Sequence, residues 1–155
     1  MSLQEKEFSL SYSNESTIDF HICQDPELNW LSTFECDKFK RFFIVIDENV
    51  DKIWGEKIFT QLDKHSKDKF VMRVPAEENS KSINYYLKVV EFLEARKCGR
   101  FDLVIGIGGG IILDLVSFTA SIYMRGLAFY AVPTTIIGQV DAITAGKTCL
   151  NTNNS

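Results

Sequence analysis

Three consecutive glycines join two apolar runs within residues 102–114, whose sequence is DLVIGIGGGIILD. Residues 102–107 are almost all apolar, as in a parallel strand that is buried on both faces. Residues 111–124 are apolar on nearly every side of a helix, which predicts a helix packed between layers. A buried strand that runs through a glycine turn into a buried helix is typical of an α/β fold.

The glycine turn itself indicates a site for a diphosphate. A side chain at Gly108, Gly109 or Gly110 would hold a ligand away. Glycine instead lets backbone N–H groups touch phosphate oxygens at the positive end of the helix dipole. The spacing is not the G-x-G-x-x-G dinucleotide fingerprint, because the glycines fall at 106, 108, 109 and 110. A tight turn with a purely structural purpose is the alternative.

Periodic apolar residues predict the elements around this turn. Residues 1–25 are expected to form a β-hairpin from two alternating runs, Phe8, Leu10 and Tyr12, then Ile18, Phe20 and Ile22. Buried strands are predicted at 42–46, 70–74 and 127–132. One helix is predicted with a face formed by Trp54, Ile58 and Leu62. A second helix, ending near Gly99, is marked by Ile83, Leu87, Val90 and Leu93.

Strands and helices alternate along residues 40–151, which predicts a Rossmann-like parallel sheet with helices on both faces. The chain has 155 residues, 45% hydrophobic and 25% charged, which suits one domain with a sizeable core. His21 is expected to be exposed on the polar face of the hairpin. His65, near the end of a helix, is expected to contact the helix dipole.

Charge, hydropathy and cysteine spacing argue against several classes of protein. The net charge of −4, without a long basic run, speaks against nucleic acid or an anionic membrane as the main partner. No apolar run is long enough to span a bilayer and no signal sequence is present, so we expect a cytoplasmic protein. Distant cysteines predict reduced thiols rather than a zinc or redox site: Cys23, Cys36, Cys98 and Cys149.

Polar residues follow the predicted strands, at the edge where parallel sheets bind ligands. Asp47 and Asn49 follow the first strand, where a carboxylate could bind ribose hydroxyls and repel a 2′-phosphate, which favours NAD over NADP. A helix-capping Asx turn is the alternative for Asp47. The residues after the later strands are Glu78 and Lys81, then Thr134 and Thr135, then Asp141 and Lys147.

Four motifs stand in order within about fifty residues: GGGIILDL at 108–115, YMRG at 123–126, VPTT at 132–135, and QVD at 139–141 with Gly146, Lys147, Thr148 and Asn151. The triplet at 146–148 is not a P-loop, because Asp141 stands where that motif needs glycine or alanine. Instead the series resembles 3-dehydroquinate synthase, within the sugar-phosphate cyclases. Asp47 and Glu78 extend the resemblance upstream, so that it covers residues 42–151.

The resemblance implies an NAD- and metal-dependent enzyme of the shikimate pathway, which leads to the aromatic amino acids. It would convert the seven-carbon sugar acid phosphate DAHP to 3-dehydroquinate and phosphate. Transient oxidation by NAD acidifies a C–H bond for phosphate elimination, and re-reduction, ring opening and aldol closure follow. The implied cofactor-binding residues are Asp47, Asn49, Glu78, Lys81, Gly109, Gly110, Asp114, Thr134 and Thr135. Asp141 and Lys147 would meet the substrate as catalytic residues, and Arg125 would bind its anion across a homodimer interface.

Several departures from the family pattern concern substrate choice. Leu113 and Ser117 stand where glycines are usual, and Ala142 with Ala145 changes a Ser-Ser-x-Gly-Gly-Lys pattern. A related cyclase that acts on sedoheptulose 7-phosphate is therefore an alternative. An iron-dependent alcohol or glycerol dehydrogenase is another, although Ile111 replaces the serine of their glycine turn. A nucleotide-binding module without catalysis is the last.

The family continues with a helical domain whose glutamate and two histidines bind a divalent metal, zinc or cobalt, and this C-terminal domain is absent from the chain. With only His21 and His65 present, no metal site is expected in these residues. We therefore expect residues 1–155 to form an N-terminal NAD-binding domain that binds nucleotide weakly and has no activity alone.

Overall fold

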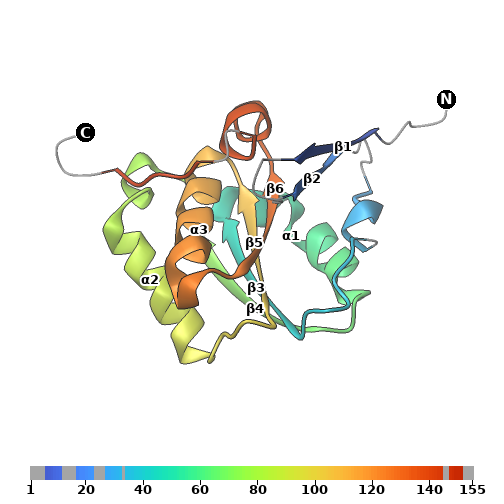
Figure 1. The fold of residues 1–155 in the computed structure, drawn as a ribbon, viewed down its shortest axis with the longest axis horizontal. Coiled ribbons are helices and arrows are strands. Elements are labelled where there is room, and N and C mark those ends of the chain that lie inside the picture. The colour runs from blue at the N-terminus through green and yellow to red at the C-terminus, as the bar shows by residue number, and fades with distance from the viewer. Residues whose placement is uncertain (1–5, 12–16, 23–26, 33, 145–146, 152–155) are drawn as a thin grey trace.

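The computed structural model describes residues 6–11, 17–22, 27–32, 34–144 and 147–151, and these contain a four-stranded parallel sheet (Figure 1). The strands are β3 (Arg41–Asp47), β4 (Asp68–Val74), β5 (Leu103–Gly108) and β6 (Ala128–Pro133). They lie side by side in the order β4-β3-β5-β6, each pair parallel. The predicted Rossmann-like sheet is confirmed, and each strand lies close to its predicted bounds.

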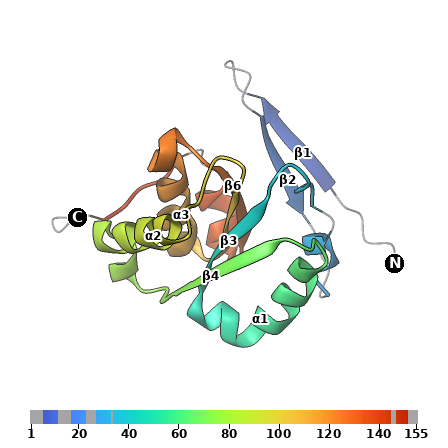
Figure 2. The same cartoon turned by 90° about the horizontal axis from the view of Figure 1, so that it is seen from below.

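Helices connect the strands and cover both faces of the sheet. They are α1 (Glu48–Asp63), α2 (Ile83–Ala95) and α3 (Gly110–Ile122). The two perpendicular views show α1 on one face and α2 with α3 on the other (Figure 1 and Figure 2). Shorter helical turns precede β3 and follow the later strands: η1 (Asn29–Ser32), η2 (Glu78–Ser80), η3 (Tyr123–Arg125) and the π-helical η4 (Gly138–Ala142).

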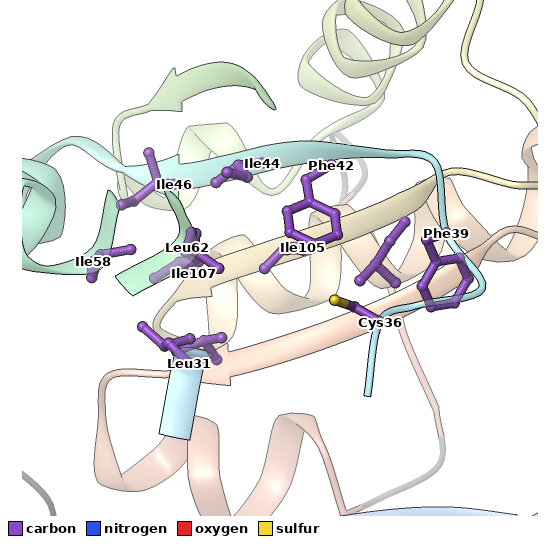
Figure 3. Close-up of a cluster of buried hydrophobic side chains, with 12 residues drawn as sticks. Leu31, Cys36, Phe39, Phe42, Ile44, Ile46, Ile58, Leu62, Ile105 and Ile107 are labelled. Carbon is purple, nitrogen blue, oxygen red and sulfur yellow. The ribbon is translucent and has the colours of Figure 1, made fainter. Parts of the chain in front are cut away.

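The alternation of side chains along β3 builds two separate cores. Phe42, Ile44 and Ile46 point toward α1, where they pack with side chains of β5 and of α1 (Figure 3). Phe43 and Val45 point to the opposite face and pack under α2 and α3. All five are fully buried, and burial of such a side chain stabilises the fold by roughly 1.5–3 kcal/mol. This explains why residues 42–46 of β3 are all apolar.

The buried faces of α1 and α2 differ in part from the prediction. Ile58 and Leu62 of α1 are buried, but Trp54 is 43% exposed. In α2, Leu93 is buried, whereas Ile83 and Leu87 are exposed. The prediction did not include the glycine and aromatic residues that complete the packed faces. These are Gly55 in α1 and Tyr85, Tyr86 and Phe92 in α2.

Left-handed residues end two of the helices earlier than predicted. After α2, Lys97 adopts a φ of 51°, and its N–H donates to the carbonyl of Glu94. The N–H of Cys98 donates to the carbonyl of Leu93, as in a Schellman motif, so the helix ends before Gly99. After α3, Tyr123 is extended with a ψ of 128° and Met124 follows with a φ of 50°, so the helix ends at Ile122 rather than at 124.

The predicted hairpin is confirmed as β1 (Lys6–Ser11) and β2 (Thr17–Ile22), paired antiparallel. Tyr12, predicted as part of it, lies outside the described residues. In the register of the hairpin, His21 stands opposite Glu7, and its exposure stays a prediction.

The prediction of a helix-dipole contact for His65 is wrong. Its Nε2 lies 2.7 Å from the carbonyl oxygen of Leu31, and its Nδ1 lies 3.0 Å from Sγ of Cys36. The ring also packs edge-on against Phe34. His65 therefore ties the segment before β3 to the end of α1, a long-range contact that no local pattern indicates.

An ion pair joins the first residue of β3 to the residue before β5. Arg41 donates from Nε to Oδ1 of Asp102 at 3.0 Å and from Nη2 to Oδ2 at 2.7 Å. Its guanidinium also donates to the carbonyl oxygens of Arg96 and Lys97, after α2. The side chain of Asp102 is only 3% exposed. Its charge therefore depends on this bidentate partner.

We expect Arg41→Met to lower the free energy of unfolding by about 3 kcal/mol, because the buried carboxylate of Asp102 would lose its partner. Urea denaturation followed by circular dichroism measures the loss. The matched control is Arg73→Met, which removes a pair with Asp51 whose arginine side chain is 54% exposed. That variant should lose less than about 1 kcal/mol. Equal losses in the two variants would contradict the role of Arg41.

Candidate functional site

The strand order creates a topological switch point between β3 and β5. From β3 the chain moves outward to β4, and from β5 it moves the opposite way to β6. The ends of the two central strands are adjacent, because a Cβ atom at Gly108 would lie 3.3 Å from the Cβ of Asp47. Open α/β sheets bind ligands in the crevice outside such strand ends. The candidate site therefore lies at the carboxyl ends of β3, β5 and β6.

The three glycines of the turn have different neighbours. A Cβ atom at Gly108, the last residue of β5, would lie 2.8 Å from the side chain of Ile112. At Gly109 it would lie 3.1 Å from Cγ2 of Thr135. At Gly110, the first residue of α3, it would have no described atom within 4 Å. Packing therefore requires the first glycine, which supports the structural interpretation there, whereas the last glycine faces open space, so ligand binding at the turn stays a prediction.

The N-terminus of α3 is suited to an anion. Among the described residues, no side chain caps it, and its first turn contains no acidic residue. The first backbone bond of the helix runs from the N–H of Leu113 to the carbonyl of Gly109 at 3.0 Å. Helical geometry leaves the N–H groups before Leu113 without helical partners. These donors and the positive end of the dipole lie beside the open space at Gly110.

Residues predicted around this turn lie close to it. Oδ1 of Asp47 accepts a 2.7 Å hydrogen bond from the N–H of Asn49, which is the Asx cap considered as its alternative role. The N–H of Thr134 donates to the carbonyl of Gly108 at 2.9 Å. Oγ1 of Thr135 accepts from the N–H of Gly138 at 3.0 Å, and both threonines are exposed. The cap of Asp47 uses one carboxylate oxygen, so it is compatible with a ribose contact.

Lys81 and Asp114 form a second group beside the turn. Nζ of Lys81 lies 2.5 Å from Oδ2 of Asp114, and the side chains are 16% and 15% exposed. Asp114 stands one helical turn after Gly110, so the pair flanks the N-terminus of α3. Burial acts to lower the pKa of Lys81, but hydrogen bonds and charge from Asp114 and Cys149 outweigh it and raise the pKa above its ordinary value.

The structure separates Arg125 from this group. It is exposed at the far end of α3, and a helix of 13 residues places that end about 20 Å from the glycine turn. Asp141 is exposed on η4, and Lys147 is exposed at the start of residues 147–151. Gly146 and the Ala145 of the departing pattern lie outside the described residues.

Two departures from the family pattern have a packing role. Leu113 is 1% exposed, and a Cβ atom at Gly138 would lie 3.4 Å from its Cδ1, so Leu113 fills the space between α3 and η4. Ser117 donates through Oγ to Oγ1 of Thr148 at 2.9 Å, and Thr148 donates to the carbonyl of Asp114 at 2.7 Å. The role of Thr148 was not predicted, because no local spacing links it to α3.

Neither a metal centre nor a membrane span is found in the part of the chain that the structure describes. No group of three or more His, Cys, Asp or Glu side chains there could hold a metal ion. No helix there is both long and apolar enough to cross a membrane. The candidate site in these residues is the uncapped N-terminus of α3 at the switch point of the sheet.

Such a fold and site define a Rossmann-like domain of the kind found in sugar-phosphate cyclases. A solved 2-deoxy-scyllo-inosose synthase, complexed with carbaglucose-6-phosphate, NAD+ and Co2+, has the same fold: the TM-score is 0.85 at 18% identity over 97% of this chain and 41% of that one. The 2-epi-5-epi-valiolone synthase ValA of Streptomyces hygroscopicus, with NAD+ and Zn2+ bound, matches with a TM-score of 0.73 at 30% identity. That match covers 83% of this chain and 36% of ValA.

The chain belongs to the 3-dehydroquinate synthase family, whose N-terminal family model matches residues 71–155. It is 39% identical to the 3-dehydroquinate synthase of Enterococcus faecalis strain V583 over 73% of this chain and 32% of the relative. It is 40% identical to the 2-epi-5-epi-valiolone synthase of Streptomyces albus over 73% of this chain and 28% of the relative. The chain thus spans about a third of the length of these relatives.

We expect the Lys81–Asp114 pair to stabilise the fold at neutral pH and to lose this effect at alkaline pH. Lys81→Met should cost roughly 1–2 kcal/mol near neutral pH, between the values for exposed and buried pairs. The folded pKa of Lys81 is raised, so this stabilisation is complete below the ordinary pKa of 10.5 and is lost as pH rises through the folded value. Urea denaturation of both proteins at pH 8 and at higher pH measures the difference. The pairing would be contradicted if the loss of unfolding free energy in Lys81→Met grew with pH. It would also be contradicted if that loss equalled the loss in the exposed control Lys52→Met.

Proposed function

We propose that this chain is the nucleotide-binding part of a 3-dehydroquinate synthase, an NAD- and metal-dependent lyase that cyclises DAHP to 3-dehydroquinate with loss of phosphate. One observation carries the proposal: in a member of this family, Gly110 faces open space beside an uncapped helix N-terminus at the switch point of the described sheet. A methyl group there would occupy the space in which a diphosphate approaches the backbone N–H groups.

In this proposal NAD lies across the ends of β3, β5 and β6. Gly109 and Gly110 hold its diphosphate, and Thr134 and Thr135 contact it from the end of β6. Asp47 and Asn49 bind the adenosine ribose, and the carboxylate disfavours a 2′-phosphate. Glu78, Lys81 and Asp114 bind the nicotinamide side. Support comes from the contacts between Asp47 and Gly108, Gly109 and Thr135, and Lys81 and Asp114.

The substrate in this proposal meets side chains of η4 and of the segment that follows. When bound, NAD would accept a hydride from the substrate carbon that carries a hydroxyl, as that hydroxyl loses its proton and becomes a ketone, and would later return the hydride. Lys147 would pair with the carboxylate of the substrate, and Asp141 would accept hydrogen bonds from its hydroxyls. Both side chains are exposed in this chain, as residues that receive a ligand need to be.

We propose a homodimer in which Arg125 of one copy serves the other. The argument is distance: Arg125 stands about 20 Å from the glycine turn of its own chain, beyond the reach of its side chain. It is exposed at a tight turn, where it adopts a φ of 67°. A guanidinium suits the bidentate binding of a phosphate or a carboxylate.

The described residues do not fit a metal ion, because they offer no ligand group. Metal dependence, with zinc or cobalt, is therefore proposed only for an enzyme of the family's full length and is assigned to none of these side chains. We also propose a cytoplasmic location, a nucleotide-binding core at residues 40–151 and an accessory hairpin at residues 1–25.

We expect Gly110→Ala to weaken NAD binding without destabilising the chain. The added methyl meets no described atom within 4 Å, and alanine is the better helix former, so the free energy of unfolding should be unchanged or slightly higher. The affinity for NAD should fall at least tenfold, measured by calorimetry. Gly99→Ala is the matched control: it adds a methyl at an ordinary 3.9 Å contact before β5, at the opposite edge of the sheet. Equal NAD affinity in all three proteins would exclude the turn as the cofactor site.

Phosphate release tests the reaction. The natural polypeptide that carries these residues, supplied with NAD and Zn2+ or Co2+, should release phosphate from DAHP. The 155-residue chain alone should release none at an enzymatic rate, since its described residues contain no metal ligand group. Release from sedoheptulose 7-phosphate instead would identify a cyclitol synthase, the alternative favoured by the 40% identity to a valiolone synthase. Net NADH formation without phosphate release would indicate a dehydrogenase, and nucleotide binding without turnover a non-catalytic module.

A further inference from the structure

Residues 147–151 form an extended segment that crosses the outside of α3 and reaches the start of α2, as the last red stretch of the ribbon shows (Figure 1). Exposure alternates along its first four residues, as in a strand. Lys147 and Cys149 are exposed, whereas Thr148 and Leu150 are partly buried. Leu150 packs against the core between the sheet, α2 and α3.

The segment contacts both elements that carry the Lys81–Asp114 pair. On α3, Thr148 donates to the carbonyl of Asp114 at 2.7 Å. On the other side, the backbone N–H of Asn151 donates to the carbonyl of Lys81 at 2.8 Å, and Nδ2 of Asn151 donates to Oε1 of Glu78 at 2.5 Å. A parallel β-bridge between Ser82 and Asn151 completes the junction.

Within residues 78–82 the local contacts are backbone hydrogen bonds, such as Ser80 N–H to the Glu77 carbonyl at 2.8 Å and Lys81 N–H to the Glu78 carbonyl at 3.1 Å, and Ser80 is buried. Among the described residues no side chain caps η2 or α2, and Oγ of Ser80 is buried without a hydrogen-bond partner. Lys81 has φ −80° and ψ 59°, which belongs to neither a helix nor a strand. The contacts that join Lys81 to α3 and to residues 147–151 are its ion pair with Asp114, a hydrogen bond with Cys149 and the bond that its carbonyl accepts from Asn151.

We propose that Asn151 is a positioning residue, which holds Glu78 and Lys81 against Asp114 and so sets the nicotinamide half of the cofactor site. This inference rests on the proposed binding of NAD. Because the same segment begins at Lys147, proposed above to bind the substrate carboxylate, a displacement of the segment by substrate would reach the cofactor residues directly. No contact of Asn151 with a ligand is required.

The test separates the side-chain contact of Asn151 from the fold. Asn151→Asp keeps the shape and the backbone bond but places a carboxylate against the carboxylate of Glu78. In the double variant Glu78→Gln with Asn151→Asp, a donor and an acceptor face each other again with the polarity reversed. Asn84→Ala, at an exposed position of α2, is the control.

Two measurements on the 155-residue chain read out the effect. Hydrogen exchange without ligand should be about tenfold faster in residues 78–82 and 147–151 of Asn151→Asp, and the double variant should restore it. In calorimetry, Asn151→Asp should weaken NAD about tenfold while ADP, which contacts only the adenosine side, changes less than about twofold.

Three results would each overturn the positioning role. The first is an exchange rate in Asn151→Asp equal to that of the wild type, and the second is a double variant that exchanges as fast as Asn151→Asp. The third is an equal loss of affinity for NAD and for ADP in Asn151→Asp. If wild-type chain binds neither nucleotide, the proposed function fails and the NAD part of the inference with it. In that case a slow, wild-type exchange rate in the double variant would still support the contact between Asn151 and residues 78–82. Failure of the proposed function is therefore distinguishable from failure of the positioning role.

Discussion

The close approach of α3 to β5 is the contact on which the site depends. A Cβ atom at Gly106 would lie 3.1 Å from the ring of Phe129 and 3.3 Å from Cβ of Val116, and one at Gly108 would lie 2.8 Å from Ile112. Larger residues would push the helix away from the strand. Because glycine allows the contact, the helix N-terminus stays at the sheet edge beside Asp47 and presents its N–H groups there.

The same packing explains which parts of the fold were predictable from sequence. The central strands are buried on both faces, so residues 42–46 of β3 and 103–107 of β5 carry no charged or polar side chain. Such runs predict buried parallel strands directly. In contrast, α1 and α2 are covered on one side only, and their buried stripes include Gly55 and Phe92 as well as aliphatic residues. Large apolar residues such as Leu87 can then lie outside the stripe, so the pattern predicts the buried face only in part.

In the candidate site, some features are visible in the local sequence and others depend on long-range packing. The glycine turn and the polar residues after the strands are local signals, and the structure brings Asp47, Gly108 and Thr135 to one edge. The partner of each charged group is a long-range property, because it depends on how α2, α3 and the last segment pack. The pairing of Lys81 with Asp114 and the bonds of Asn151 therefore required the structure.

Backbone and side chains carry different parts of the proposed chemistry. The proposed cofactor half uses helix N–H groups whose position is fixed by buried packing, so the fold itself limits substitution at Gly106 and Gly108. The proposed substrate half uses exposed side chains such as Asp141 and Lys147, whose replacement leaves the core intact. Family members can then change substrate while the sheet and the turn stay the same. This division explains how one chain can resemble relatives with two different activities to nearly the same degree.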